Sequence, residues 1–96
     1  MRPMAHCIVA VLVPDSEPDA QAAASAVLLA QPSSLLDGFY FVEPREHVNM
    51  VFADGVLWAR DRWEQRHEGG RPMTDEDNAR LLATPGMVAV FAYIHC

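Results

Sequence analysis

The sequence contains no lysine. All seven basic residues are arginines, against thirteen acidic residues, and the net charge is −6. The absence of lysine excludes Schiff-base chemistry and a lysine-based phosphate loop, because both need an amine side chain. The acidic excess argues against general binding to nucleic acid or to an anionic membrane, since both need cationic surfaces.

Cysteine is also scarce, and Cys7 and Cys96 are too few for a secreted disulfide scaffold. No signal peptide is evident, because the apolar run that begins at Ile8 is followed by no small-residue cleavage site. We therefore expect a cytoplasmic protein. The natural start, Met1 or Met4, stays open.

Length and composition predict one folded domain over residues 1–96. The chain is 51% hydrophobic and 21% charged, so it can build a core and is not typical of disordered segments. Its two most apolar runs lie near the ends, at residues 5–13 and 87–94. Both are too short to cross a bilayer and rich in β-branched or aromatic residues, which predicts buried strands.

Turn and cap signals divide the rest of the chain. Pro14 ends the first strand, and Ser16 to Asp19 read as a helix N-terminus. Thr74 opens a later helix with three carboxylates behind it and an apolar stripe of Ala79, Leu82 and Ala83. The remaining predictions are a helix over residues 19–31 and strands over residues 38–43 and 47–53.

Residues 54–68 fit two structures. Asp54-Gly55 can form a hairpin turn, so that the residues on either side pair as strands. Alternatively, Asp54 caps a helix that continues to Gly69-Gly70, a strong stop signal. We favour the helix because of that stop signal and because Arg60 and Glu64 would lie one turn apart.

The resulting order is strand, helix, strand, strand, helix in two pieces, strand. This order predicts an α+β fold, a ferredoxin-like βαββαβ two-layer sandwich with the second helix split in two. Strands 5–13 and 87–94 would lie side by side and antiparallel at its centre. Both are apolar on both faces, whereas a two-layer fold covers one face only. We therefore expect a homodimer packed sheet to sheet.

Two His-Cys pairs, His6-Cys7 and His95-Cys96, lie near the chain ends and could together suggest a zinc site. Neighbouring residues on a strand face opposite sides of the sheet, so at most two of the four share a face. We therefore expect no metal site and no cofactor. Whether the two pairs meet stays open.

The most distinctive stretch is rich in tryptophan and arginine, the residue types most enriched at binding hot spots. It supplies a candidate partner-binding surface made of Trp58, Arg60, Arg62, Trp63 and Arg66. The competing interpretation is a helix that buries Trp63 and Ala59 and carries an ordinary salt-bridged outer face.

The sequence shows no metalloprotease, nucleophile-elbow or phosphate-loop spacing. The acidic clusters at residues 15–19 and 75–77 are typical of helix caps, although on one layer they would add to an acidic patch. We therefore expect a small non-catalytic protein-binding module, a regulator or inhibitor that acts by steric and electrostatic occlusion.

The alternative is a small-molecule-binding protein or small enzyme. It would use an apolar pocket between the sheet and the helices of a dimer. His47 or His67 would then supply the polar or acid–base group, because imidazole titrates near neutral pH. The aromatic candidates for the lining are Phe39, Tyr40, Phe41, Phe52, Trp58, Phe91 and Tyr93.

Overall fold

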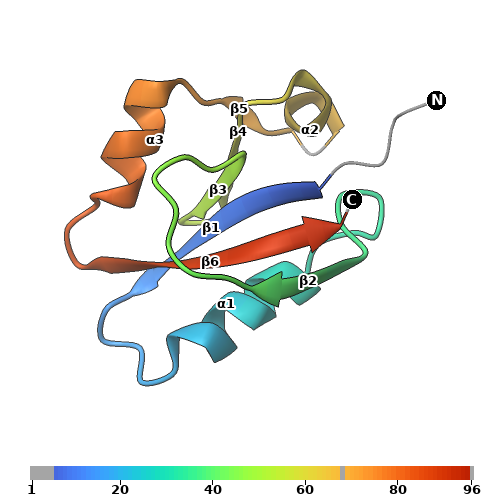
Figure 1. Ribbon diagram of the computed structural model, residues 1–96. Helices are drawn as coiled ribbons and strands as arrows, with labels where there is room; N and C mark the ends of the chain where they lie inside the picture. Colours follow the sequence, from blue (N-terminus) through green and yellow to red (C-terminus); the bar gives the residue numbers. More distant parts are fainter. Residues whose placement is uncertain (1–5, 68, 96) are drawn as a thin grey trace.

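An antiparallel ladder between the two terminal apolar runs forms the centre of the fold. β1 (His6–Pro14) and β6 (Met87–His95) pair over nine residues, from His6 opposite His95 to Pro14 opposite Met87. The computed structural model, which describes residues 6–67 and 69–95, thus confirms that these runs are central antiparallel neighbours (Figure 1).

The described part of the chain forms one mixed sheet of six strands in the order β2-β6-β1-β3-β4-β5. The remaining strands are β2 (Gly38–Phe41), β3 (Met50–Ala53), β4 (Val56–Ala59) and β5 (Arg71–Pro72). β3 runs parallel to β1, and β5 runs parallel to β4. The α+β class is confirmed. The ferredoxin-like topology is not confirmed, because the sheet has six strands, not the four of a βαββαβ fold, and their order is unusual.

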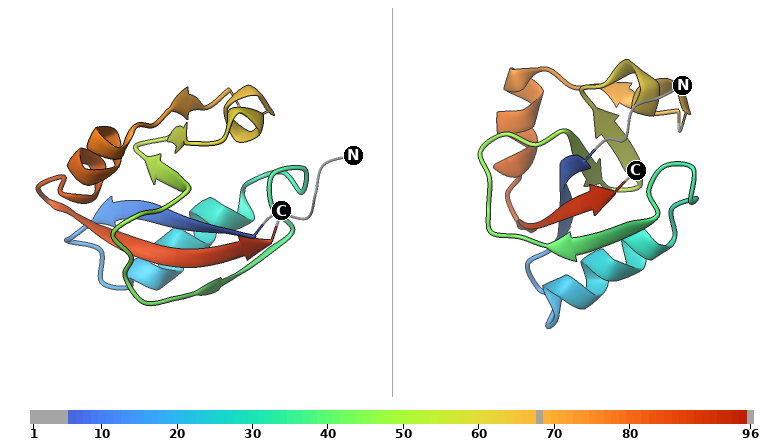
Figure 2. Two further views of the ribbon diagram at one scale, coloured as in Figure 1. Left: turned by 45° about the horizontal axis from the view of Figure 1, so that its top comes forward. Right: turned by 45° about the vertical axis from the view of Figure 1, so that its right-hand side comes forward.

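Helices cover both faces of the sheet (Figure 2). α1 (Ala20–Leu29) packs Ala24 and Leu28 into a buried cluster with Val9 and Val11 of β1. α3 (Asp75–Leu82) packs Leu81 against the opposite face. In the described residues, no helix has the length and apolar character needed to span a membrane.

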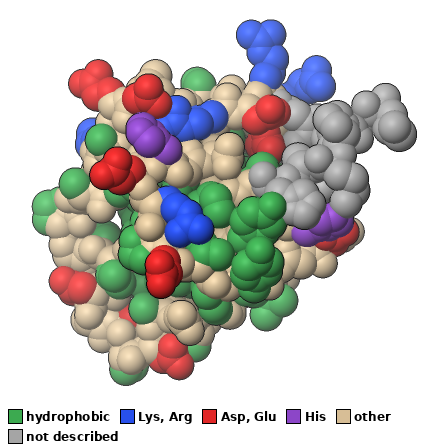
Figure 3. Space-filling model, viewed as in Figure 1, with side chains coloured by type: hydrophobic (Ala, Val, Ile, Leu, Met, Phe, Trp, Pro, Cys, Tyr) green, Lys and Arg blue, Asp and Glu red, His purple; other side chains and the backbone are tan. Residues whose placement is uncertain are grey.

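The expectation of one wholly uncovered sheet face is therefore wrong, because α3 covers part of it. The remainder of that face stays open, and apolar side chains gather there over β2 and β6 (Figure 3). Tyr40 is 61% exposed and stacks on Tyr93, with ring centroids 5.3 Å apart. The homodimer was predicted from the bare face and stays a prediction.

Residues 54–67 contain both of the structures that the sequence left open for residues 54–68. Asp54 and Gly55 both have positive φ, 52° and 76°, and turn β3 into β4 as a tight hairpin. A short helix follows, α2 (Arg62–His67). The favoured helix is thus wrong over β4, because Leu57 and Ala59 alternate into the buried face as strand residues do.

The helix caps differ in detail from those expected. Asp19, not Ser16, caps α1, and its side chain accepts a hydrogen bond of 3.0 Å from the Ala22 N–H. Thr74 and Asp77 form a reciprocal capping box on α3. Because α1 and α3 lie on opposite faces, the two acidic clusters do not share one layer.

The apolar stripe expected on α3 is correct only for Leu82, which packs against the core, and the buried Asn78 lies on the same helix. Ala79 and Ala83 are exposed, whereas Asn78 is 1% exposed. The Asn78 amide oxygen accepts from the Val48 N–H at 3.1 Å, and its nitrogen donates to the Glu46 carbonyl at 2.9 Å. A polar side chain therefore attaches the loop that precedes β3 to α3.

We predict that Asn78→Ala lowers the free energy of unfolding by about 2 kcal/mol, because it leaves the buried Val48 N–H without an acceptor. Urea denaturation measures the change. Glu76→Gln, an exposed substitution on the same helix, serves as the control and shifts stability by less than about 0.5 kcal/mol. Equal effects of the two substitutions contradict the role given to Asn78.

Candidate functional site

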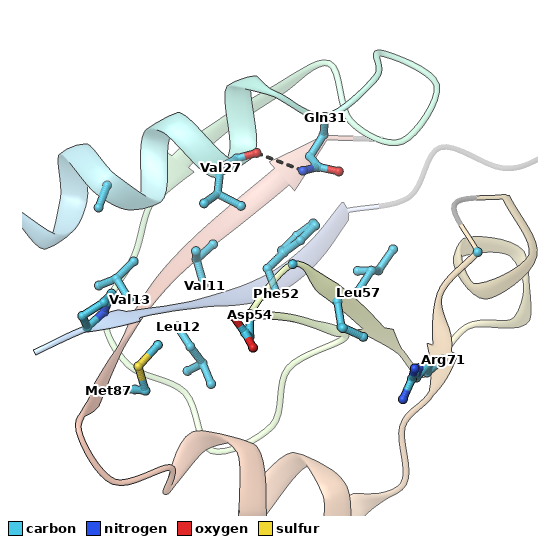
Figure 4. Close-up of a pocket in the computed structure, with 15 residues that line it drawn as sticks. Val11, Leu12, Val13, Val27, Gln31, Phe52, Asp54, Leu57, Arg71 and Met87 are labelled. Carbon is cyan, nitrogen blue, oxygen red and sulfur yellow. Dashed lines mark hydrogen bonds between the residues drawn. The ribbon is translucent and has the colours of Figure 1, made fainter.

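An apolar groove lies on the α1 side of the sheet, between α1 and the β3–β4 hairpin (Figure 4). Its volume is about 620 Å³. Val11 of β1, Phe52 of β3 and Leu57 of β4 form its floor, and Val27 of α1 points into it from the opposite wall.

The floor of the groove is deep. Val11, Phe52 and Leu57 are only 1%, 7% and 8% exposed, so the floor consists of core side chains. It exists because α1 packs on β1 and β6, whereas the hairpin continues the sheet beyond the reach of α1. The alanine-rich wall of α1, where Ala23 lines the groove, keeps the cleft open.

Few polar groups line the groove. The Gln31 side chain donates to the Val27 carbonyl at 3.0 Å, so its amide nitrogen is already engaged. Asp54 and Arg71 are exposed and lie at the rim. The lining contains no histidine, cysteine or serine in the described part of the chain. This arrangement can hold apolar groups, but it does not assemble a nucleophile with a base.

A buried carboxyl holds α2 against the sheet near the groove. Glu64 is 3% exposed, and the Cys7 thiol donates to its Oε1 at 3.8 Å. Its Oε2 has no hydrogen-bond partner within the described residues. Burial raises the pKa of Glu64 above its ordinary value of 4.5, and a hydrogen bond with Asp61 and the Asp61 charge raise the pKa further.

Two residues of the predicted partner-binding surface, Arg60 and Trp58, make contacts with other residues of the same chain. The Arg60 side chain donates to the Val48 carbonyl at 2.8 Å and to Asp75 at 2.6 Å, so it does not pair with Glu64. Trp58 is half-buried on the α3 side, and the Arg80 guanidinium carbon lies 5.6 Å from its ring centroid.

The other predicted site residues lie elsewhere. Arg62 and Arg66 are exposed on α2, and His47 is exposed on the loop before β3. The side chains of Trp63 and His67 lie outside the described part of the structure. Trp58 and Arg62 are thus on different elements, and no contact here tests whether any of these residues meets a partner.

The ladder places the start of β1 beside the end of β6. His6 lies opposite His95 in register, and the next residue, Cys7, is buried. His95 Nδ1 lies 2.6 Å from the Asp37 carboxylate. No group of three potential metal ligands occurs among the described residues, and Cys96 lies outside them.

Comparison with known proteins gives no match. No protein-family model, no curated protein sequence and no solved structure matches this chain.

We predict that stability falls as the pH rises above the ordinary Glu64 pKa. The folded state raises that pKa, so it favours the protonated carboxyl. The contribution of Glu64 to the free energy of unfolding is therefore complete below about pH 4.5. It is lost as the pH rises through the folded-state pKa of Glu64. At neutral pH, Glu64→Gln should therefore stabilise the protein, by on the order of 1 kcal/mol.

Thermal unfolding of both proteins from pH 4 to pH 8 measures this effect, and the difference between them should grow with pH. Glu76→Gln supplies the control, because Glu76 is exposed on α3. A constant difference across the range contradicts the burial of a titrating Glu64.

Proposed function

We propose that this protein is a non-catalytic protein-binding module and that the groove is its binding site. The observation that carries the proposal is the deep apolar floor of Val11, Phe52 and Leu57 beside a wall of small residues. A partner segment that places one or two apolar side chains in the groove would bury them without any rearrangement of the helices.

Three exposed arginines favour an acidic partner segment. Arg71 of β5 lies at the groove rim, as does Asp54, and Arg62 and Arg66 are exposed on α2, which precedes β5. Guanidinium groups suit carboxylates and accelerate association with them. Of the partner-binding surface predicted from the sequence, Arg62 and Arg66 thus remain candidates for partner contact. Trp58 and Arg60 instead make contacts within the protein.

Occlusion is the mechanism that this arrangement supports. A bound partner segment would be shielded by α1 on one side and by the hairpin on the other, and so would be withheld from its other contacts. This suits a regulator or inhibitor acting in the cytoplasm, because neither role needs a reacting group or a cofactor.

A small apolar molecule is the second candidate occupant. The groove volume of about 620 Å³ lies within the range of small-molecule sites, and Arg71 could pair with an acidic head group. His47 is not in the groove, so it plays no part in this version of the site.

We predict that Ala23→Leu lowers the affinity for groove-binding peptides at least about tenfold, because the larger side chain fills the space that the partner needs. The peptides are selected from a displayed library on the wild-type protein, and titration calorimetry measures their affinity. Ala22→Leu is the matched control, since Ala22 is the adjacent exposed residue of α1.

If Ala23→Leu leaves the peptide affinity unchanged, the groove is not the peptide-binding site. If no peptide is selected but a fluorescent apolar dye binds the wild type and not Ala23→Leu, the small-molecule function is favoured instead.

We further predict that Arg62→Ala with Arg66→Ala slows association of the selected peptides and reduces its dependence on salt. The physical reason is the loss of long-range attraction to acidic residues, while the dissociation rate stays near that of the wild type. Stopped-flow fluorescence at two salt concentrations measures both rates. Arg80→Ala, on the opposite face, is the control. Selected peptides without acidic residues contradict this prediction.

A further inference from the structure

β2 is an edge strand without the features that normally protect an edge. Natural edges carry charged residues, proline or a bulge, or are very short, because unpaired backbone groups otherwise attract another strand. The other edge, β5, consists of only Arg71 and Pro72. β2 reads Gly-Phe-Tyr-Phe, with no charge and no proline. Of the two edges of the described sheet, β2 is therefore the less protected, although it is only four residues long.

The backbone of β2 offers donors and acceptors on its outer side. Beyond the strand end, the Val42 N–H donates to the Phe91 carbonyl at 3.0 Å, and Tyr40 lies opposite Tyr93 in register. Residues alternate along an antiparallel strand, so Phe39 and Phe41 direct their N–H and C=O groups away from β6. Within the described chain, no other strand pairs with this side of β2.

A hollow lies on each side of this edge. One, of about 450 Å³, is lined by Leu28, Leu29 and Leu36 on the α1 side. The other, of about 360 Å³, is lined by Tyr40 and Tyr93 on the α3 side. Leu29 at 75% and Tyr40 at 61% are the two most exposed large hydrophobic residues described, and each lies in one of the hollows.

These two hollows suit an added strand. Successive side chains of a strand point to opposite faces, so an extended segment paired with β2 would place alternate side chains in the two hollows. Backbone hydrogen bonds then give affinity and the hollows give specificity, as in other cases of strand addition.

We propose that the β2 edge binds an extended segment of a partner protein, apolar on both faces and flanked by basic residues. Asp37 and Glu43 are exposed on either side of β2 and supply the charge preference, and Asp37 also contacts His95 Nδ1 at 2.6 Å. This site is separate from the groove, and the inference does not rest on the function proposed for the groove.

The same charges disfavour a second copy of the chain as the occupant. In antiparallel self-pairing with the largest overlap, Phe39 of one copy lies opposite Phe41 of the other. That register places Asp37 opposite Glu43 at both ends. Like charges directly opposite each other destabilise a strand pair.

The test uses the whole protein and blocked synthetic peptides with a short Val/Leu core. One peptide is flanked by arginines and a second by glutamates. A third repeats the arginine-flanked sequence with alternate backbone nitrogens methylated, which prevents pairing. The arginine-flanked peptide should slow amide exchange at Phe39 and Phe41 at least about tenfold and bind at least about tenfold more tightly than the glutamate-flanked peptide. The methylated peptide should not bind.

Two sets of variants sharpen the result. Leu29→Ser should weaken binding, while Val88→Ser should not, because Val88 is exposed at the far end of β6, outside the segment paired with β2. Asp37→Asn with Glu43→Gln should abolish the preference for arginine. Unchanged exchange at Phe39 and Phe41, or equal binding of the methylated peptide, overturns the proposal. Exchange that slows with protein concentration in the absence of peptide also overturns it, in favour of a second copy.

Discussion

The β1–β6 ladder is the constraint on which the rest of the structure depends. It joins two strands whose side chains are buried on both faces, so each face must find a cover. α1 supplies the cover on one face and α3 on the other. The remaining strands extend this pair outward, and the groove and the β2 edge both lie where the helices stop. Both candidate binding surfaces are therefore regions that the helices leave uncovered.

The central strands were predictable because continuous apolar runs of strand length have few alternatives. The Asp54-Gly55 turn was recognisable but ambiguous, because aspartate also caps helices and a real helix, α2, begins soon after the hairpin. The coverage of the second face was not predictable, because α3 contributes few large apolar residues. A buried amide, Asn78, binds the loop backbone, and no hydrophobic pattern reports such a contact.

The candidate sites, too, were only partly predictable from the sequence, because they depend on contacts between residues that are distant along the chain. The sequence placed Arg62 and Arg66 in a candidate partner-binding surface; both are exposed on α2, and their binding role stays a prediction. Arg60 lies close to both in sequence, yet it pairs with Asp75 at the start of α3. The groove combines residues from five separate segments, so no local spacing could reveal it. Glu64 looked like a surface residue because buried carboxyls are rare.

The register of the central ladder also bears on the order of assembly. His6 pairs with His95, so β1 can reach its main neighbour only after all the elements between β1 and β6 have been synthesised. Closing so long a loop is slow in comparison with forming local hairpins and helices. Until then, the apolar side chains of β1 have no lasting cover on a growing chain. The apolar side chains of β1 thus lack their main neighbour throughout the synthesis of these intervening elements.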